Sequence, residues 1–447
     1  MKQSNVVDFV AIGVGPFNLG LACLTEPIKD LNGIFLDKKE KFNWHPGMLL
    51  QDTTLQVPFL SDLVTLADPT NPFSFLNYIK QKGRMYSFYI RENFLLLRNE
   101  YNQYCQWAIE KLSNIYFNTE VTHVNFDENE NIYIVTSRCT KTGEIKIYKA
   151  KKLVLGTGTP PYIPESCKKL KGKAVHSSQY LDHKENLQKQ RKITVLGSGQ
   201  SAAEIFYDLL QEVDTIGYEL NWITRSPRFF PLEYSKLTLE MTSPEYVDYF
   251  YDLPAEKRDD LIKNQKHLYK GINSDLIAAI HESLYTKRVV AEDKINVSLR
   301  TNTELINTEL KQDSIQLDLH QVEQDKYFTH ETEGLVLATG YAYQLPDFVE
   351  GISNRVMWDD KERFDVARNY SIDKNKSEIF VQNAELHTHG FVTPDLGMAA
   401  YRNSYIIKEM TGVEHYPIET SIAFQQFRVS KEEEIMYASS RFPTKIL

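Results

Sequence analysis

The chain has 447 residues and a formal net charge of −9, with 42% hydrophobic and 25% charged residues. This length allows two or three domains with full cores, and the composition is typical of globular proteins in water. The acidic balance argues against a nucleic-acid partner, and no apolar stretch approaches the ~18 residues that a membrane span needs.

The first predicted element is a strand over residues 6–12, so near the start of the chain that we expect no signal peptide. It leads into a glycine turn that opens a helix, with the sequence Gly13-Val-Gly15-Pro16-Phe-Asn18-Leu-Gly20. Such glycines let the backbone approach a pyrophosphate, and the helix N-terminus offers free N–H groups. The next strand ends in Asp37, 24 positions after Gly13, about where a carboxylate meets a ribose hydroxyl. The unit predicts a dinucleotide site.

The middle of the first unit is less regular. An aromatic and proline-rich stretch over residues 42–72 has little periodicity, and a loop of this length is usually functional. Helical patterns follow over 74–82 and 99–112, and alternating strands run from 115 to 154.

A second glycine turn follows the strand 192–196 and reads Gly197-Ser-Gly199-Gln200-Ser201-Ala202. The next strand ends at Arg225, where the first unit has an acid, and an arginine suits a 2′-phosphate. We therefore assign FAD to the first site and NADPH to the second. The chain has no C-x-x-C, which argues against a dithiol reductase, and its four scattered cysteines fit the cytoplasm.

These units predict an α/β fold with two Rossmann-like dinucleotide-binding domains and a small, mostly helical insert that binds the substrate. The run 335–341 is expected to return the chain to the first domain. The predicted FAD domain has two parts, 1–165 and 331–447. The predicted NADPH domain also has two parts, 166–235 and a return segment, 288–330. The insert, 236–287, lies between the two parts of the NADPH domain.

The residues resemble the class B flavoprotein monooxygenases, which share two glycine turns, the Ala-Thr339-Gly340-Tyr turn and a Gly-x-x-x-His segment, here 172–176. The stretch after Trp44-His45-Pro, with residues 55–60 and 68–78, is similar to the N-hydroxylating enzymes of siderophore biosynthesis, the lysine/ornithine N-monooxygenase family. Residues 382–384 and 387–390 extend the resemblance to nearly the whole chain.

The resemblance implies a reaction in which NADPH reduces FAD and the reduced flavin traps O2 as a C4a-hydroperoxide. A neutral primary amine then becomes a hydroxylamine. Gln56 resembles the family glutamine beside the flavin and is our candidate catalytic residue. Trp44 and His45 are expected over the flavin, and Gln200, Ser201 and Arg225 against NADPH. By resemblance we also expect a homodimer or homotetramer.

The substrate site departs from the amino-acid hydroxylases of this family. The lysine that pairs with the substrate carboxylate is replaced by Ser61, and two asparagines are replaced by Leu239, before Glu240, and Leu268, before Tyr269. A buried carboxylate without these partners is costly, so the pocket favours a diamine such as putrescine or cadaverine. The diamine-hydroxylating branch of the family, which this pattern resembles, acts in hydroxamate siderophore pathways. A shifted alignment would place the asparagines at Asn264 or Asn273.

Three questions stay open at this point. Glu240 and Asp62 are both candidates to hold the second ammonium of a diamine. The alternatives to a diamine enzyme are a lysine or ornithine hydroxylase with a relocated carboxylate site, and a nucleotide-binding protein without turnover. His387 and His389 do not predict a metal site, because no third ligand stands out.

Overall fold

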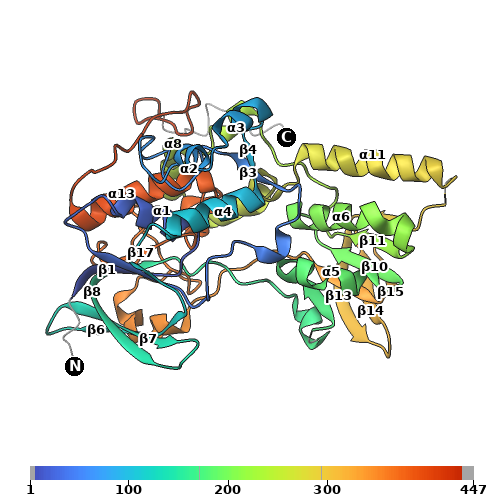
Figure 1. The fold of residues 1–447 in the computed structure, drawn as a ribbon, viewed down its shortest axis with the longest axis horizontal. Helices are drawn as coiled ribbons and strands as arrows, with labels where there is room; N and C mark the ends of the chain where they lie inside the picture. Colours follow the sequence, from blue (N-terminus) through green and yellow to red (C-terminus); the bar gives the residue numbers. More distant parts are fainter. Residues whose placement is uncertain (1–5, 171, 293, 435–447) are drawn as a thin grey trace, which may run out of the picture.

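The computed structural model describes residues 6–170, 172–292 and 294–434. It has two lobes side by side, each built on its own sheet (Figure 1). The predicted α/β class with two strand–glycine turn–helix units is confirmed. The outer ends of the first and last predicted segments, 1–5 and 435–447, lie outside the described residues.

The first lobe contains a seven-stranded sheet in the order β5-β2-β1-β8-β7-β6, with β17 paired to β8. Strand β1 is parallel to β2 and β8, whereas β6, β7 and β8 are antiparallel. The strands are Val7–Ile12, Gly33–Leu36, Ile115–Tyr116, Thr119–Asp127, Ile132–Cys139, Ile145–Leu155 and Ile379–Val381, numbered β1, β2, β5, β6, β7, β8 and β17.

Both faces of this sheet are covered, which explains why β1 is apolar from Phe9 to Ile12. One face packs on α1 (Pro16–Thr25), α4 (Arg98–Ile109) and α13 (Ala399–Thr411). The other face packs on the 3-10 segment η4 (Asp347–Arg355). Because β17 and α13 come from the end of the chain, the first lobe closes only when the C-terminal segment returns.

The second lobe contains a five-stranded parallel sheet in the order β12-β11-β10-β16-β9. Its strands are Val297–Arg300, Glu219–Ile223, Lys192–Leu196, Gly334–Leu337 and Ala174–His176, in that order. One face packs on α5 (Tyr180–Gln188) and α6 (Gln200–Ile216). The other face packs on a three-stranded antiparallel sheet of β13, β14 and β15, over Thr303–Leu310, Ile315–Gln321 and Lys326–Thr332.

One predicted boundary is wrong. The NADPH return was expected to end at 330, but β16 pairs with β10 and β9 and so belongs to the second sheet. The chain crosses to the first lobe only after Leu337. A short apolar run such as 334–337 suits a buried strand in either sheet, so its pairing is decided by tertiary contacts.

The predicted insert, 236–287, holds α7 (Lys236–Leu239), α8 (Pro244–Asp252), α9 (Ala255–Asn264), α10 (His267–Lys270) and most of α11. Helix α11 (Ser274–Val290) extends past the predicted end and lies along α6 (Figure 1). Helices α8 and α9 contact α12 (Leu386–His389), which belongs to the C-terminal segment. The insert therefore spans both lobes.

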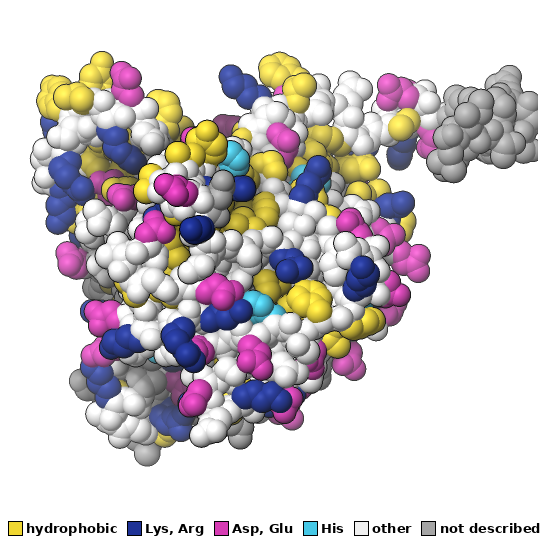
Figure 2. All heavy atoms as spheres, turned by 90° about the vertical axis from the view of Figure 1, so that its right-hand side faces the viewer, with side chains coloured by type: hydrophobic (Ala, Val, Ile, Leu, Met, Phe, Trp, Pro, Cys, Tyr) yellow, Lys and Arg dark blue, Asp and Glu magenta, His cyan; other side chains and the backbone are white. Residues whose placement is uncertain are grey.

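The connecting segments hold shorter elements. They are η1 (Pro46–Met48), β3 (Thr54–Pro58), α2 (Phe75–Gln81), α3 (Met85–Arg91), β4 (Leu95–Leu97), η2 (Glu165–Leu170), η3 (Ser177–Gln179) and η5 (Leu396–Met398). None of the described helices is long and apolar enough to cross a membrane. On the face of the second lobe in Figure 2, basic and acidic side chains are interspersed and form no continuous basic stripe.

Candidate functional site

One cavity of about 2420 Å³ contacts both glycine turns. It lies at the carboxyl ends of β1, β2 and β8 in the first sheet and of β10, β11 and β16 in the second. In open α/β sheets this edge is where ligands bind. The predicted cofactor residues that line it are Gly13, Gly15, Pro16, Asn18, Asp37, Trp44, His45, Gln56, Gly197, Gly199, Gln200, Ser201, Arg225, Thr339 and Gly340.

The first glycine turn is shaped by close backbone approach. Gly13 has φ +90°, and a Cβ there would lie 2.3 Å from the Gly156 carbonyl oxygen. The Asn18 amide donates to the Gly13 carbonyl at 2.7 Å, which fixes the turn. By contrast, a Cβ on Gly15 would meet no atom within 4 Å. Helix α1 starts here without a side-chain cap, so its first N–H groups are left for a ligand.

Asp37 follows β2 and lies beside this turn. Its Oδ2 accepts from the Val14 amide at 2.7 Å, and its Oδ1 accepts from the Lys39 amide at 2.7 Å. These bonds hold the carboxylate against the turn, and each oxygen keeps a further lone pair. The geometry fits the predicted contact with a ribose hydroxyl.

The second glycine turn repeats the arrangement. Gly197 has φ +156°, and a Cβ there would lie 2.3 Å from the Ala338 carbonyl oxygen. Helix α6 begins after Gly199 without a side-chain cap. Both cradles therefore offer bare backbone to one cavity, which fits two pyrophosphates.

The Gln200 side chain has a different role from the one predicted. Its Oε1 accepts from the Asn273 amide at 2.8 Å and from Gln56 Nε2 at 3.4 Å, and its Nε2 donates to Glu204 at 2.8 Å. The side chain thus joins the first lobe, the insert and α6, and its backbone and one Nε2 N–H remain for NADPH. Gln56 Nε2 also donates to the Gly271 carbonyl at 3.3 Å, which leaves the Gln56 carbonyl oxygen for a ligand.

Arg225 lies at the end of β11 and is exposed in the cavity wall. Lys270, from α10, lines the same cavity. The surrounding protein, together with the positive charges of Lys266 and Arg225, lowers the pKa of Lys270. This cluster of cations suits a phosphate. The sequence analysis missed Lys270, although the basic pair Lys266 and Lys270 in the insert was a visible signal.

Four aromatic side chains connect the lobes at the edge of the cavity. His45 Nδ1 is 3.2 Å from the Tyr341 hydroxyl, and Trp44 packs edge-on against His45. His176 Nε2 is 3.0 Å from the Gly340 carbonyl oxygen, which holds the predicted Thr339-Gly340 turn in place. Removal of water by the surrounding protein, with Arg98 and Lys39 nearby, lowers the pKa of His45 to about 4, so the ring is neutral at pH 7.

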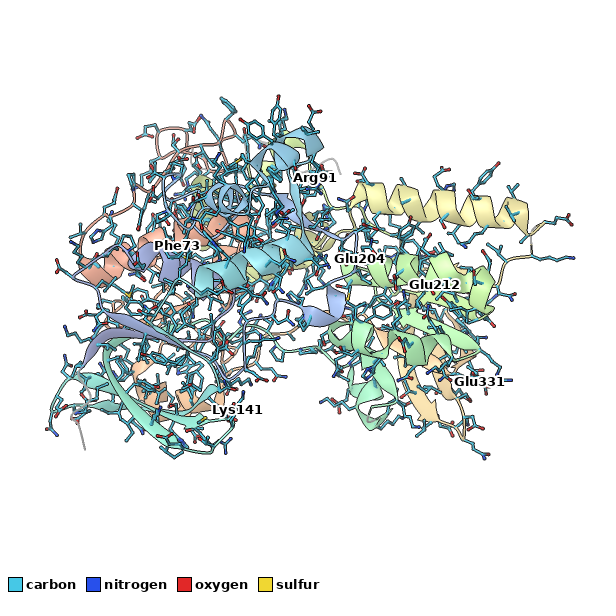
Figure 3. The ribbon with its side chains drawn as sticks, viewed as in Figure 1. Phe73, Arg91, Lys141, Glu204, Glu212 and Glu331 are labelled. Atoms are coloured by element: carbon cyan, nitrogen blue, oxygen red, sulfur yellow. The ribbon has the colours of Figure 1, made fainter. Side chains whose placement is uncertain are left out.

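A buried ion pair holds the two cradles together. Arg98, at the start of α4, lies 2.7 Å from Glu204 of α6, and Glu204 is at the junction of the lobes in Figure 3. Burial raises the pKa of Glu204, while Arg98 and the Gln200 amide oppose this rise. The sequence analysis did not identify this pair, because its members are 106 positions apart.

The predicted substrate residues separate in the structure. Tyr269 lines the cavity. Ser61 is buried, and Leu268 packs in the cluster around α8, but neither lines the cavity wall itself. Leu239 is 43% exposed, and Glu240 bonds Gln425 of the C-terminal segment at 3.0 Å. Leu239 and Glu240 therefore do not line the cavity, because the end of α7 directs them toward solvent and the C-terminal segment.

Two other candidates are also engaged elsewhere. Asp62 accepts from the amides of Val64, Thr65 and Phe75, so it stabilises its own loop instead of facing the cavity. Asn273 accepts from the Asp275 amide at 2.8 Å and caps α11. Neither Asn273 nor Asn264 lines the cavity.

The two histidines of α12 bond backbone carbonyls. His387 Nε2 is 2.7 Å from the Phe364 oxygen, and His389 Nε2 is 3.1 Å from the Arg368 oxygen. In the described parts of the chain, no three His, Cys, Asp or Glu side chains come together as metal ligands.

Comparison with known proteins gives consistent matches. A putrescine N-hydroxylase of Shewanella oneidensis is 54% identical, over 94% of this chain and 84% of that protein. A putrescine N-hydroxylase of Acinetobacter baumannii is 44% identical, over 97% and 96%. The crystal structure of an FAD-bound cadaverine monooxygenase of desferrioxamine biosynthesis from Erwinia amylovora matches with a TM-score of 0.94 and 59% identity, covering 96% of this chain and 99% of that one.

The model of one protein family, described as L-lysine 6-monooxygenase/L-ornithine 5-monooxygenase, matches residues 5–343. This range includes both glycine turns, the Trp44-His45 loop and the helical insert. With the relatives above, it confirms the resemblance found in the sequence, and the chain belongs to the L-lysine 6-monooxygenase/L-ornithine 5-monooxygenase family.

Proposed function

We propose that this protein is an FAD- and NADPH-dependent monooxygenase that uses O2 to hydroxylate one primary amine of putrescine or cadaverine, in hydroxamate siderophore biosynthesis. The observation that carries the proposal is the single cavity that both glycine cradles share. Two dinucleotides held there would meet at their reactive ends. The names of the two putrescine hydroxylases and the cadaverine monooxygenase support the substrate class.

The residues of the cavity divide between the two cofactors. For FAD we propose the turn from Gly13 to Asn18, with Asp37 at the ribose and Trp44 and His45 near the ring. For NADPH we propose Gly197, Gly199, Ser201, Arg225 and Lys270, the last two at the 2′-phosphate. When bound, the flavin takes electrons from NADPH and activates dioxygen, and Gln56 holds the reacting end through its free carbonyl oxygen.

The amine must lose its proton before it can react. An alkylamine has a pKa near ~10.4, so about one molecule in a few thousand is neutral at pH 7. A cavity that excludes water disfavours the charged form and lowers this pKa. The protein's contribution is to bind and orient the amine beside the cofactor and to exclude water from it.

The charge around Ser61 supports a diamine over lysine or ornithine. A substrate carboxylate needs a cation or several donors to be buried. A carboxylate, Asp395, lies near Ser61, since a Cβ on Gly397 would lie within 3.3 Å of both. An amino-acid carboxylate placed there would meet a second carboxylate.

A panel of amines tests the proposal. Putrescine, cadaverine, lysine and ornithine are each incubated with the purified flavoprotein, NADPH and O2, and the hydroxylated product is measured alongside NADPH and peroxide. We expect hydroxylamine from at least one diamine at ten times the rate of either amino acid. More product from lysine or ornithine would favour the amino-acid enzyme, and NADPH oxidation without any product would contradict both.

We further propose a cytoplasmic homodimer or homotetramer. All four cysteines are free thiols, as expected in a reducing compartment. Helix α3 and its flank expose four large apolar side chains, a contact surface typical of oligomers, namely Tyr86, Tyr89, Ile90 and Phe94. Light scattering after gel filtration would give the mass, and a monomer at micromolar concentration would contradict the oligomer.

A further inference from the structure

The turn between α12 and α13 carries a carboxylate with no task in the fold beyond one hydrogen bond. Pro394 and Leu396 line the cavity on either side of Asp395, which is not itself one of the wall residues. Asp395 Oδ1 accepts from the Gly397 amide at 2.7 Å, at the start of η5. This bond is the one that the described residues give to the carboxylate, and Oδ2 is free to accept from a ligand.

The cation whose charge acts on Asp395 already pairs with another carboxylate. Arg402 pairs with Glu385 at 2.9 Å, and both side chains are almost fully buried, with 2% and 0% exposed. Arg402 also donates to the Thr393 carbonyl at 2.6 Å. Burial raises the pKa of Asp395, whereas the Gly397 amide and Arg402 oppose this rise. A half-buried carboxylate without an ion pair is poised for a cationic ligand.

A neutral oxygen lies beside this carboxylate. A Cβ built on Gly397 would lie 3.2 Å from Asp395 Oδ1 and 3.3 Å from Ser61 Oγ, so both oxygens face the same small space. An alkylammonium has three donors and no acceptor, which matches a carboxylate with a hydroxyl oxygen beside it.

We propose that Asp395 determines substrate specificity by binding the non-reacting ammonium of the diamine, with Ser61 as a neutral partner. The inference rests on the proposed function and adds the site that distinguishes a diamine from a monoamine and from an amino acid. The two residues lie in a loop after β3 and in the turn before α13, so they come from the first lobe and the C-terminal segment.

The test compares Asp395→Asn with the wild-type holoenzyme on matched amines, cadaverine and n-pentylamine. The amide keeps the shape and can still accept from the Gly397 amide, but it has no charge. We expect kcat/KM for cadaverine to fall about 100-fold, mainly through KM, with n-pentylamine changed less than threefold. Isothermal titration of cadaverine into the oxidised holoenzyme should show the same loss of affinity. FAD content and melting temperature check the fold.

Asp68→Asn is the matched control, since Asp68 also accepts from a nearby amide in a turn, whereas neither Asp68 nor its two chain neighbours line the cavity. This control variant should leave the ratio of kcat/KM for cadaverine to kcat/KM for n-pentylamine unchanged. If Asp395→Asn does not fold, Ser61→Lys gives the second test, because its ammonium would pair with Asp395 and exclude the diamine. An unchanged ratio in a folded variant would overturn the inference. A wild-type enzyme that hydroxylates no diamine would instead overturn the proposed function.

Discussion

The cofactor end and the substrate end of the cavity differ in how they are built. Each cofactor cradle is a continuous strand, turn and helix, and every residue predicted for it lines the cavity. The substrate end is assembled from loops and turns of distant segments, and of its five predicted residues only Tyr269 lines the wall. The comparison teaches that short local motifs specify cofactor binding, whereas substrate recognition depends on contacts between segments.

The largest effect should come from the first cradle. Gly13→Ala places a Cβ 2.3 Å from the Gly156 oxygen at φ +90°, so we expect loss of bound FAD and of several kcal/mol of stability. Gly15→Ala meets no atom within 4 Å, so it should weaken FAD binding alone. Flavin absorbance and urea unfolding separate the two variants. Equal stability of both apoproteins would contradict the difference.

The next effect concerns the junction that holds the cradles together. Glu204→Gln leaves Arg98 unpaired, with its side chain 12% exposed, and should destabilise the protein by about 3 kcal/mol. The double variant Arg98→Met/Glu204→Leu removes both charges, so its free energy of unfolding should fall less than that of Glu204→Gln. Urea denaturation followed by fluorescence measures each value. A double variant less stable than Glu204→Gln would contradict the assignment of this cost to an unpaired charge.

A smaller effect separates the two cofactors. Arg225→Ala and Lys270→Ala should each raise KM for NADPH by about 10- to 100-fold, because a charge-assisted contact to the 2′-phosphate is lost. KM for NADH should change little. Steady-state kinetics with both nucleotides give the ratio, and Arg228→Ala, which does not line the cavity, is the control. A parallel rise in KM for NADH would mean that these cations contact a part of the nucleotide other than the 2′-phosphate.

The smallest expected effect is a pH dependence of stability caused by the buried histidine His389. His389 is 1% exposed, and burial and then Arg368 hold its pKa well below the usual value. The folded state therefore resists protonation of His389. The contribution of the neutral ring to the free energy of unfolding is complete above pH ~6.5 and is lost as the pH falls. Between pH 7.5 and 5.5 the wild type should lose about 1 kcal/mol more than His389→Asn. Unfolding at both pH values measures this, with His281→Asn, an exposed site, as the control.

Features that depend on residues adjacent in the chain could be predicted from the sequence. The strands before the two glycine turns, the turns themselves and the family were predicted, because Gly13 and Gly197 need a close backbone approach that no other residue allows. The residues proposed for the cofactors also line the cavity. The same local information placed the insert between two strands of the second unit. The residue types missing at Ser61 and Leu268 also indicated a pocket unsuited to a carboxylate.

The contacts between distant groups became visible only in the folded protein. The tertiary structure assigned β16 to the second sheet, gave the Gln200 side chain to Gln56 and Asn273, paired Arg98 with Glu204 and turned Glu240 toward Gln425. It also brought Asp395 to Ser61 across more than three hundred residues of chain. A hydrogen bond or ion pair depends on distance in space and leaves no periodic trace along the chain, so these contacts appear only once both lobes and the C-terminal segment have packed.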